Sequence, residues 1–81
     1  GVGNPQPSFI FENVTVLSTK MFGKNKEHLE CNIEDVTGKA TVFNFFTDET
    51  MKERFVIGSA ISFVGTLEAG WRGGVRVRIQ N

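Results

Sequence analysis

The sequence has very little cysteine and histidine, and this scarcity excludes several kinds of chemistry. Its 81 residues include one cysteine, Cys31, and one histidine, His28. A single thiol forms no internal disulfide and is too little for a zinc site built on cysteines. His28 has no partner histidine, no nearby cysteine pair and no serine nucleophile arrangement. The chain taken alone therefore shows no catalytic machinery, and an independent enzyme is the least favoured interpretation.

Long apolar runs are also missing. A membrane-spanning helix needs about 20 predominantly apolar residues, and the sequence contains no such run. No signal peptide is visible in residues 1–8, which are rich in glycine, proline and polar residues. We therefore expect no membrane partner and a cytoplasmic location, where a lone thiol stays reduced. Because the first residue is glycine rather than methionine, we expect a piece of a longer chain.

The chain carries no excess of either charge. Lys plus Arg and Asp plus Glu number 9 each, so the formal net charge is zero and does not by itself favour a polyanionic partner. Six of the nine cations are nevertheless concentrated in two segments; these six are Lys20, Lys24, Lys26, Arg72, Arg76 and Arg78. A neutral chain can still present a basic face if its fold brings two such segments together.

What the sequence does contain is alternation of apolar and polar residues, which predicts strands. The predicted strands cover residues 9–20, 28–35, 40–46, 60–68 and 75–79. The first is long enough to bend and pair with two neighbours. In it we expect Val14 and Val16 on one face and Phe11 on the other. In the second, Leu29 and Ile33 are expected to point inward.

Residues 47–55 predict a short helix. Thr47 or Asp48 can cap its start, and Met51 and Phe55, four positions apart, form its buried side. The strand before it, residues 40–46, carries apolar residues on both faces. That strand is therefore either central in the sheet or presents an aromatic ring on a working face.

The order of these elements predicts the fold class. Three strands, one short helix and two further strands make the element order of the OB-fold, a five-stranded Greek-key barrel. A small SH3-like barrel is the alternative, although it would not need a helix between strands 3 and 4. In an OB-fold, ligands lie around strands 2 and 3, flanked by the loops that join strands 1 to 2 and 4 to 5. These loops are the two basic segments of this chain.

The two loops supply the candidate nucleic-acid-binding residues. As phosphate contacts, their cations would give salt-dependent, sequence-independent binding. Trp71 lies in a glycine-rich loop, where its ring can stack on a base or fold back as a lid. The candidate set is Phe22, Lys24, Lys26, His28, Trp71, Arg72, Arg76 and Arg78, with Lys20 beside it. A solvated hairpin turn and ordinary protection of the last strand's edge are the alternative interpretations.

Two motifs resemble the RecJ family of single-stranded-DNA-specific 5′→3′ exonucleases. Residues 1–9, Gly-Val-Gly-Asn-Pro-Gln-Pro-Ser-Phe, are similar to the signature that precedes the OB domain of that family. Gly23-Lys24 and Glu27-His28-Leu29 resemble the stretch after the family's first OB strand. Weaker similarities are Val42-Phe43-Asn44-Phe45, Gly58 and Trp71-Arg72-Gly73. Gly70 and Phe46 depart from the pattern, which has Asn and Gly there.

The resemblance implies an accessory domain that binds single-stranded DNA for an exonuclease of DNA repair and recombination. Residues 1–8 would be a linker from upstream DHH nuclease domains, and residues 9–81 the OB-fold domain. The parent enzyme would use Mn²⁺ or Mg²⁺, held by the upstream domain, so neither a cofactor nor a catalytic residue is expected here. The alternative is a structural or protein-interaction barrel that packs on the nuclease core without touching DNA.

Overall fold

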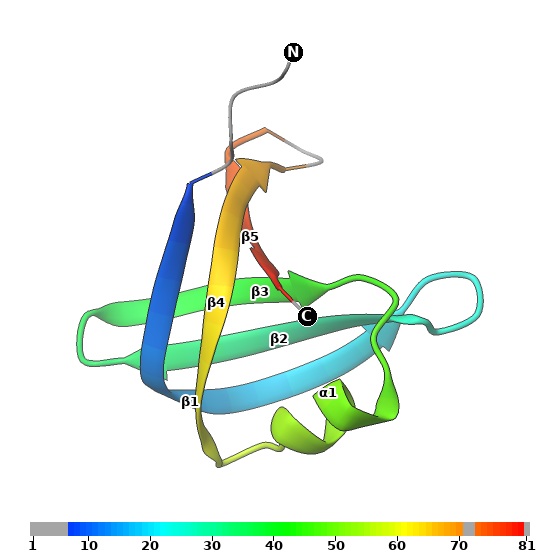
Figure 1. Cartoon of the computed structure of the whole chain (residues 1–81), viewed down its shortest axis with the longest axis horizontal. Coiled ribbons are helices and arrows are strands. Elements are labelled where there is room, and N and C mark those ends of the chain that lie inside the picture. The colour runs from blue at the N-terminus through cyan, green and yellow to red at the C-terminus, as the bar shows by residue number, and fades with distance from the viewer. Residues whose placement is uncertain (1–6, 71–72, 81) are drawn as a thin grey trace.

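Five strands and one short helix follow one another in the predicted order (Figure 1), in a computed structural model that describes residues 7–70 and 73–80. The elements are β1 (Ser8–Phe22), β2 (His28–Asp35), β3 (Gly38–Asn44), α1 (Glu49–Arg54), β4 (Ala60–Ala69) and β5 (Val75–Ile79). The strands form a closed barrel in the order β1-β2-β3-β5-β4. The pair β3–β5 is parallel and the other pairs are antiparallel. The predicted all-β class and OB-fold architecture are confirmed.

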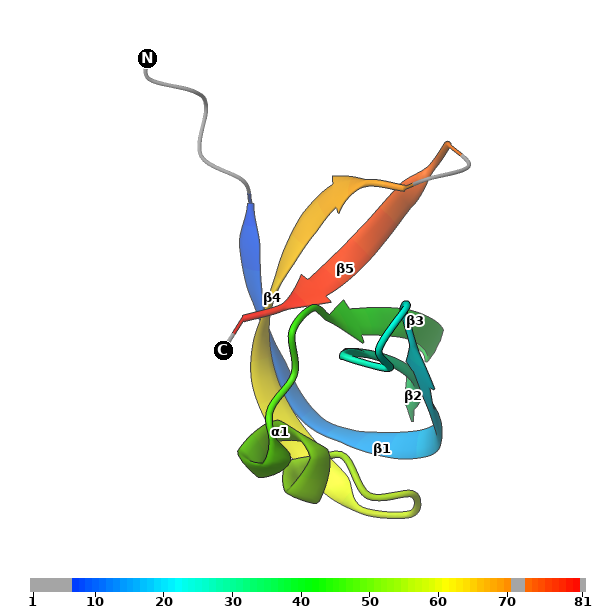
Figure 2. The ribbon, with the colours of Figure 1, turned by 90° about the vertical axis from the view of Figure 1, so that its right-hand side faces the viewer.

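The first strand bends and serves two neighbours, as the sequence predicts. Its first half pairs with β4 and its second half with β2, and both ladders include Thr15. Figure 2 shows its long curve along the side of the barrel. The ladder with β4 is irregular between Phe11 and Val14, where Asn13 has a φ of 52°. The irregularity is a β-bulge, in which β1 has one more residue than β4. Side chains before the bulge therefore point to the opposite face from the one that simple alternation predicts.

The prediction that Phe11 faces away from Val14 is therefore wrong. Phe11 is partly buried against the core, and its ring stacks on that of Phe63 with centroids 4.8 Å apart. Gly65 leaves the space for this packing. A Cβ there would lie 2.9 Å from Phe11 and 2.7 Å from Val77.

The core fills the inside of the barrel with side chains from all five strands and the helix. Its buried members are Val14, Val16, Leu29, Cys31, Ile33, Val42, Met51, Phe55, Ile61, Phe63 and Ile79. The predicted inward faces of β1 at its two valines and of β2 are confirmed. The helix begins as predicted: the Asp48 carboxylate accepts a hydrogen bond of 2.9 Å from the Met51 N–H.

The third strand ends two residues earlier than predicted. Val42 and Asn44 are buried, but Phe46 is 75% exposed and does not share their face. The reason is its backbone, which has a φ of 53° and so leaves the extended conformation that a strand requires. No helix in the described part of the chain is long and apolar enough to cross a membrane.

Candidate nucleic-acid interface

One row of side chains crosses the outer face of the barrel in register over all five strands. Lys20 of β1 lies opposite Glu30 of β2, which lies opposite Phe43 of β3. Phe43 lies opposite Arg78 of β5, and Arg78 opposite Thr66 of β4. Successive residues of a strand point to opposite faces, so the intervening positions fill the core and these stay outside. Along one line the barrel thus carries a cation, a carboxylate, an aromatic ring, a second cation and a hydroxyl.

Five rings gather where β1 ends, β2 begins and β3 ends, and we call them the aromatic cluster. They are Phe22, His28, Phe43, Phe45 and Phe46. The His28 ring is central: its centroid lies 5.2 Å from that of Phe22, 5.1 Å from Phe45 and 4.8 Å from Phe46. Phe43 joins through Phe22 at 6.1 Å and Phe45 at 6.3 Å. The antiparallel pairs β1–β2 and β2–β3 bring these strand ends together.

His28 connects the β1–β2 loop to the segment after β3. Its Nδ1 accepts a 3.1 Å hydrogen bond from the Phe46 N–H, so the neutral ring carries its proton on Nε2. Nε2 lies 3.2 Å from a carboxylate oxygen of Glu27. With a side chain only 15% exposed, His28 positions its neighbours. A direct contact between His28 and phosphate stays a prediction.

The β1–β2 loop is fixed at its base and open at its tip. A Cβ on Gly23, which has a φ of 102°, would lie 2.6 Å from the Glu27 carboxylate, so glycine is needed there. The other oxygen of that carboxylate accepts a 2.8 Å hydrogen bond from the Asn25 N–H. Lys24 and Lys26 are exposed. The loop backbone is therefore fixed by the Glu27 carboxylate, while two ammonium groups extend into solvent.

Two arginines of β5 cover the edge of the aromatic cluster. The guanidinium carbons of Arg76 and Arg78 lie 5.0 Å and 4.6 Å from the centroid of the Phe45 ring, within the range of cation–π attraction. Both also pair with Glu68 of β4. Arg76 Nε lies 2.6 Å from one oxygen of that carboxylate, and Arg78 Nε lies 3.3 Å from the other. The Arg76 side chain is 15% exposed and that of Arg78 46%, so Arg78 is the more accessible cation.

Comparison with known protein families adds evidence from the whole chain to this arrangement of rings and cations. A family model described as the RecJ OB domain matches residues 1–81. The chain belongs to the RecJ OB domain family. The resemblance carried by the Gly-Asn-Pro and Gly-Lys…His-Leu motifs is thereby confirmed. The comparisons with curated proteins and with solved structures found no match.

In this RecJ OB domain the two predicted loops lie at different corners of the molecule. Figures 1 and 2 show the β1–β2 loop and the β4–β5 end apart, with β3 and β5 between them. Of the predicted site residues, the structure joins Phe22, His28, Arg76 and Arg78 through the aromatic cluster. Trp71 and Arg72 lie outside the described residues.

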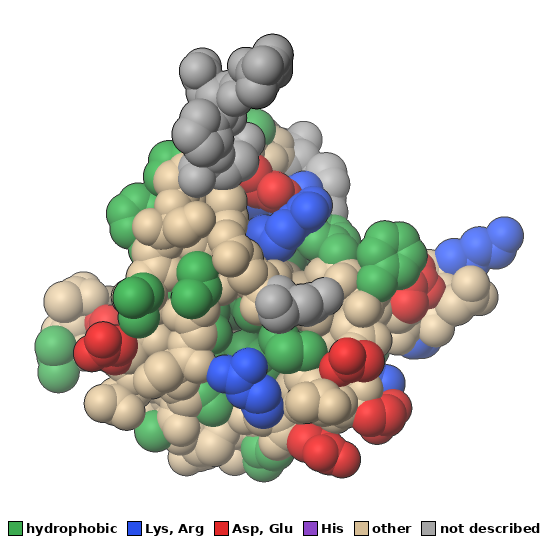
Figure 3. Space-filling view, viewed as in Figure 1, with side chains coloured by type: hydrophobic (Ala, Val, Ile, Leu, Met, Phe, Trp, Pro, Cys, Tyr) green, Lys and Arg blue, Asp and Glu red, His purple; other side chains and the backbone are tan. Residues whose placement is uncertain are grey.

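The candidate nucleic-acid-binding residues predicted from the sequence did not include three rings of the aromatic cluster or Glu68. Phe43, Phe45 and Phe46 could have been found, because an aromatic ring on a working face was one of the two interpretations of a strand that is apolar on both faces. Glu68 could not, because its partners lie on the next strand and depend on register. On the side drawn in Figure 3, basic and acidic side chains are interspersed, as such pairing requires.

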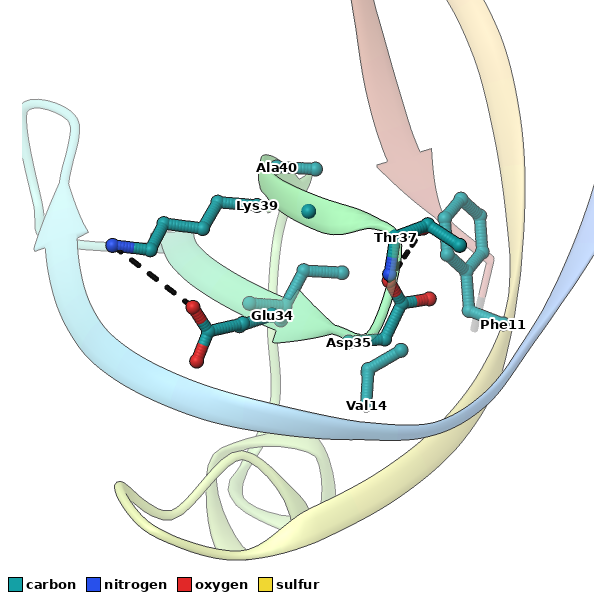
Figure 4. Close-up of a pocket in the computed structure, with 9 residues that line it drawn as sticks. Phe11, Val14, Glu34, Asp35, Thr37, Lys39 and Ala40 are labelled. Atoms are coloured by element: carbon teal, nitrogen blue, oxygen red, sulfur yellow. Dashed lines mark hydrogen bonds and ion pairs between the residues drawn. The ribbon is translucent and has the colours of Figure 1, made fainter.

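Away from the aromatic cluster, a pocket lies at the turn between β2 and β3 (Figure 4). Its volume is about 140 Å³, and it is lined in part by Phe11, Val14, Asp35 and Thr37. The Thr37 hydroxyl and N–H both donate to the Asp35 carboxylate, at 2.5 Å and 2.8 Å, and these bonds lower the pKa of Asp35. The polar groups thus satisfy one another within the turn. We do not assign a ligand to it.

Across residues 7–70 and 73–80, no group of three or more His, Cys, Asp or Glu side chains is arranged to hold a metal ion. The family model that matches describes an OB domain. We therefore derive no metal-dependent step from this chain.

Proposed function

We propose that this RecJ OB domain binds single-stranded DNA across the aromatic cluster and the β5 arginines. The observation that carries the proposal is the Phe45 ring, covered by two guanidinium groups and continuous with four further rings. Bases of any sequence stack on aromatic rings, and each stacked base is worth about 1–3 kcal/mol. Cations beside the rings contact the phosphates that connect those bases.

The residues divide by accessibility into two roles. Arg78, Lys24 and Lys26 are exposed and would contact phosphate oxygens. Phe22 and Phe43 are half-buried and would offer ring faces or edges to bases. The sequence-based candidates Trp71 and Arg72 would extend the contact at the β4–β5 end. Single strands would thus run from one predicted loop to the other.

Within the parent protein we propose an accessory role. The domain would hold a strand for upstream DHH nuclease domains that degrade it in the 5′→3′ direction with Mn²⁺ or Mg²⁺. Its setting would be cytoplasmic DNA repair and recombination, with residues 1–8 as the linker. The family match and the outer-face chemistry support this role.

A protein-interaction barrel is the second candidate, and a separate surface favours it. On the outside of the β1–β4 pair, Ile10 and Val64 lie directly opposite each other, and their side chains are 72% and 39% exposed. Phe9, the preceding residue, is 46% exposed but belongs to the opposite face of the strand. Adjacent exposed apolar residues mark a surface suited to packing on another domain. This surface does not overlap the aromatic cluster, so both candidates can hold together.

The test is a titration of a fluorescently labelled oligothymidine with the 81-residue chain, followed by anisotropy at several salt concentrations. We expect binding that weakens as salt rises. Arg78→Ala should lower the slope of log K against log salt by about 0.7, the value for one phosphate contact on a single strand. Lys39→Ala is the matched control, since Lys39 is an exposed cation at the start of β3.

Two results would count against the proposal. One is the absence of binding at low salt and high protein concentration. The other is an equal effect of Arg78→Ala and Lys39→Ala, which would mean that the cations act only through overall charge. In either case the exposed β1–β4 surface would become the leading candidate interface.

A further inference from the structure

One ring of the aromatic cluster differs from the others in its exposure. Phe46 is 75% exposed, whereas Phe22, Phe43, Phe45 and His28 are half-buried. Among the phenylalanines in the described part of the chain, only Phe9 approaches this exposure, at 46%. Phe46 is therefore the ring with the most unoccupied surface, and it lies at the border of the proposed DNA-binding face.

The backbone of Phe46 is in a conformation that its side chain disfavours. Its φ of 53° lies in the left-handed region, where bulky residues are genuine outliers. Within residues 7–70 and 73–80, the other non-glycine residues with positive φ are Asn13 and Lys26. Asn adopts this region readily, and Lys26 lies in an exposed loop. Strain of this kind persists where the surroundings enforce it and is concentrated at ligand-binding sites.

Two hydrogen bonds enforce the conformation. The Phe46 N–H donates to His28 Nδ1 at 3.1 Å, and the Thr47 N–H donates to the Glu27 carbonyl oxygen at 2.8 Å. Both acceptors lie at the start of β2. The His28 ring then meets the Phe46 ring edge to face, at 4.8 Å and 85°. The start of β2 thus holds Phe46 by its backbone and leaves its ring largely in solvent.

From these observations we infer that Phe46 is a base-stacking residue, held open so that an unpaired base can lie on its exposed face. This inference rests on the proposed DNA-binding function and adds a specific contact to it. The ring offers a π-face to any base, so the contact is sequence-tolerant. Beyond its edge-to-face contact with His28, a ring that is 75% exposed adds little to packing. The strained backbone would relax with a residue that adopts the left-handed region more readily.

The test compares two substitutions that suit a left-handed backbone equally well. Asn and His are both enriched there, but only His retains an aromatic ring. With labelled oligothymidine, Phe46→Asn should weaken binding by about 5- to 150-fold, the range for one stacked base. Phe46→His should stay near the wild type. With an abasic oligonucleotide of the same length, all three chains should bind alike, because the phosphates remain and the bases do not.

A thermal melt separates loss of contact from loss of fold. We expect the melting temperature of Phe46→Asn to equal or exceed that of the wild type, since strain is relieved. The inference is overturned if Phe46→Asn binds oligothymidine like the wild type, or loses as much affinity for the abasic strand. If Arg78→Ala weakens binding while Phe46→Asn does not, the proposed function stands and this inference fails. If the wild type does not bind, both fail.

Discussion

At the scale of single residues, Cys31 shows how strongly this small barrel isolates its interior. Its side chain is 0% exposed, and burial raises its pKa from the ordinary value of 9.0 to about 11. The thiol therefore stays protonated in the folded chain at pH values where an unfolded chain would already carry thiolate. Since thiolate is the reactive form, a buried and protonated thiol is inert.

We predict that Cys31 resists alkylation. At pH 8.5 the folded chain should react with iodoacetamide far more slowly than the same chain in 6 M guanidinium, a comparison that mass spectrometry measures directly. The free energy of unfolding should also decrease between about pH 9 and pH 11. In that interval the unfolded state releases the Cys31 proton while the folded state keeps it, so rising pH favours unfolding. The Cys31→Ala chain should lack this component.

Rapid alkylation of the folded chain, at the rate seen in guanidinium, would contradict the prediction. It would mean that the barrel opens around β2 on the timescale of the reaction. An identical pH dependence in the Cys31→Ala chain would assign the weakening to other groups.

The residue scale is also where prediction from sequence failed. Alternation correctly assigned Val14, Leu29 and Ile33 to the core, because an extended backbone alternates faces automatically. It misassigned the face of Phe11 and extended the third strand to Phe46, and both errors trace to a left-handed residue, Asn13 in one case and Phe46 itself in the other. Neither residue is a glycine, so the alternation alone does not mark the break. The available signals were that Asn adopts the left-handed region readily and that the RecJ pattern has Gly at the position of Phe46.

At the scale of elements, the pairing of β4 with β5 determines how available the arginines are. Glu68 lies directly opposite Arg76 in this ladder and reaches both arginine side chains. Its carboxylate therefore occupies the same donors that a phosphate would use. The register of two antiparallel strands has placed an internal anion inside the proposed interface.

We predict that Glu68→Gln tightens binding of oligothymidine. Removal of the negative charge frees Arg78 for phosphate, and the gain should be about 2- to 5-fold, in the range of an exposed ion pair of about 0.5–1 kcal/mol. Glu34→Gln is the matched control, because it removes the same charge from another cross-strand pair, with Lys39 at 3.9 Å. Anisotropy titrations of both variants at one salt concentration make the comparison.

Weaker binding by Glu68→Gln than by Glu34→Gln would reverse the interpretation. The carboxylate would then act by orienting the guanidinium groups over Phe45, and its positioning role would outweigh its competition with phosphate.

At the scale of the whole molecule, the barrel closes through its shortest ladder. The parallel pair β3–β5 has two register pairs, Val42 with Val77 and Phe43 with Arg78. Beside them the side-chain amide of Asn44, 1% exposed, donates to the Ile79 carbonyl oxygen at 3.2 Å. A buried polar residue thus completes the closure where the backbone ladder ends.

We predict that Asn44→Ala weakens this closure selectively. Loss of the Asn44 amide leaves the buried Ile79 carbonyl oxygen without this hydrogen-bond donor. The expected cost is about 1–3 kcal/mol in the free energy of unfolding. Amide hydrogen exchange should accelerate first along β3 and β5 and only later along β1 and β2. Asn32→Ala is the control, because Asn32 bonds to Ser18 and Thr41 on the half-exposed outer face of β2. Uniform acceleration in all strands would show that the barrel has no separate closing step.

The architecture as a whole could be predicted from sequence more fully than the site. Element order and the helix after the third strand sufficed for the OB-fold, because few barrels place a helix there. The aromatic cluster depends on which strand ends meet, and its pairing with Arg76 and Arg78 depends on the parallel β3–β5 register. Such contacts between distant segments follow from the closed barrel and have no local pattern in the sequence.

The division of β1 between two neighbours has a consequence for how the chain is made. Ser8 pairs with Thr66, so the first half of β1 leaves the ribosome long before its partner strand exists. Its second half can form a hairpin with β2 at once, while Phe9 and Ile10 stay unpaired on a free edge. An unpaired apolar edge is a template for other chains. Synthesis that stalls before β4 therefore leaves an aggregation-prone strand edge exposed on the nascent chain.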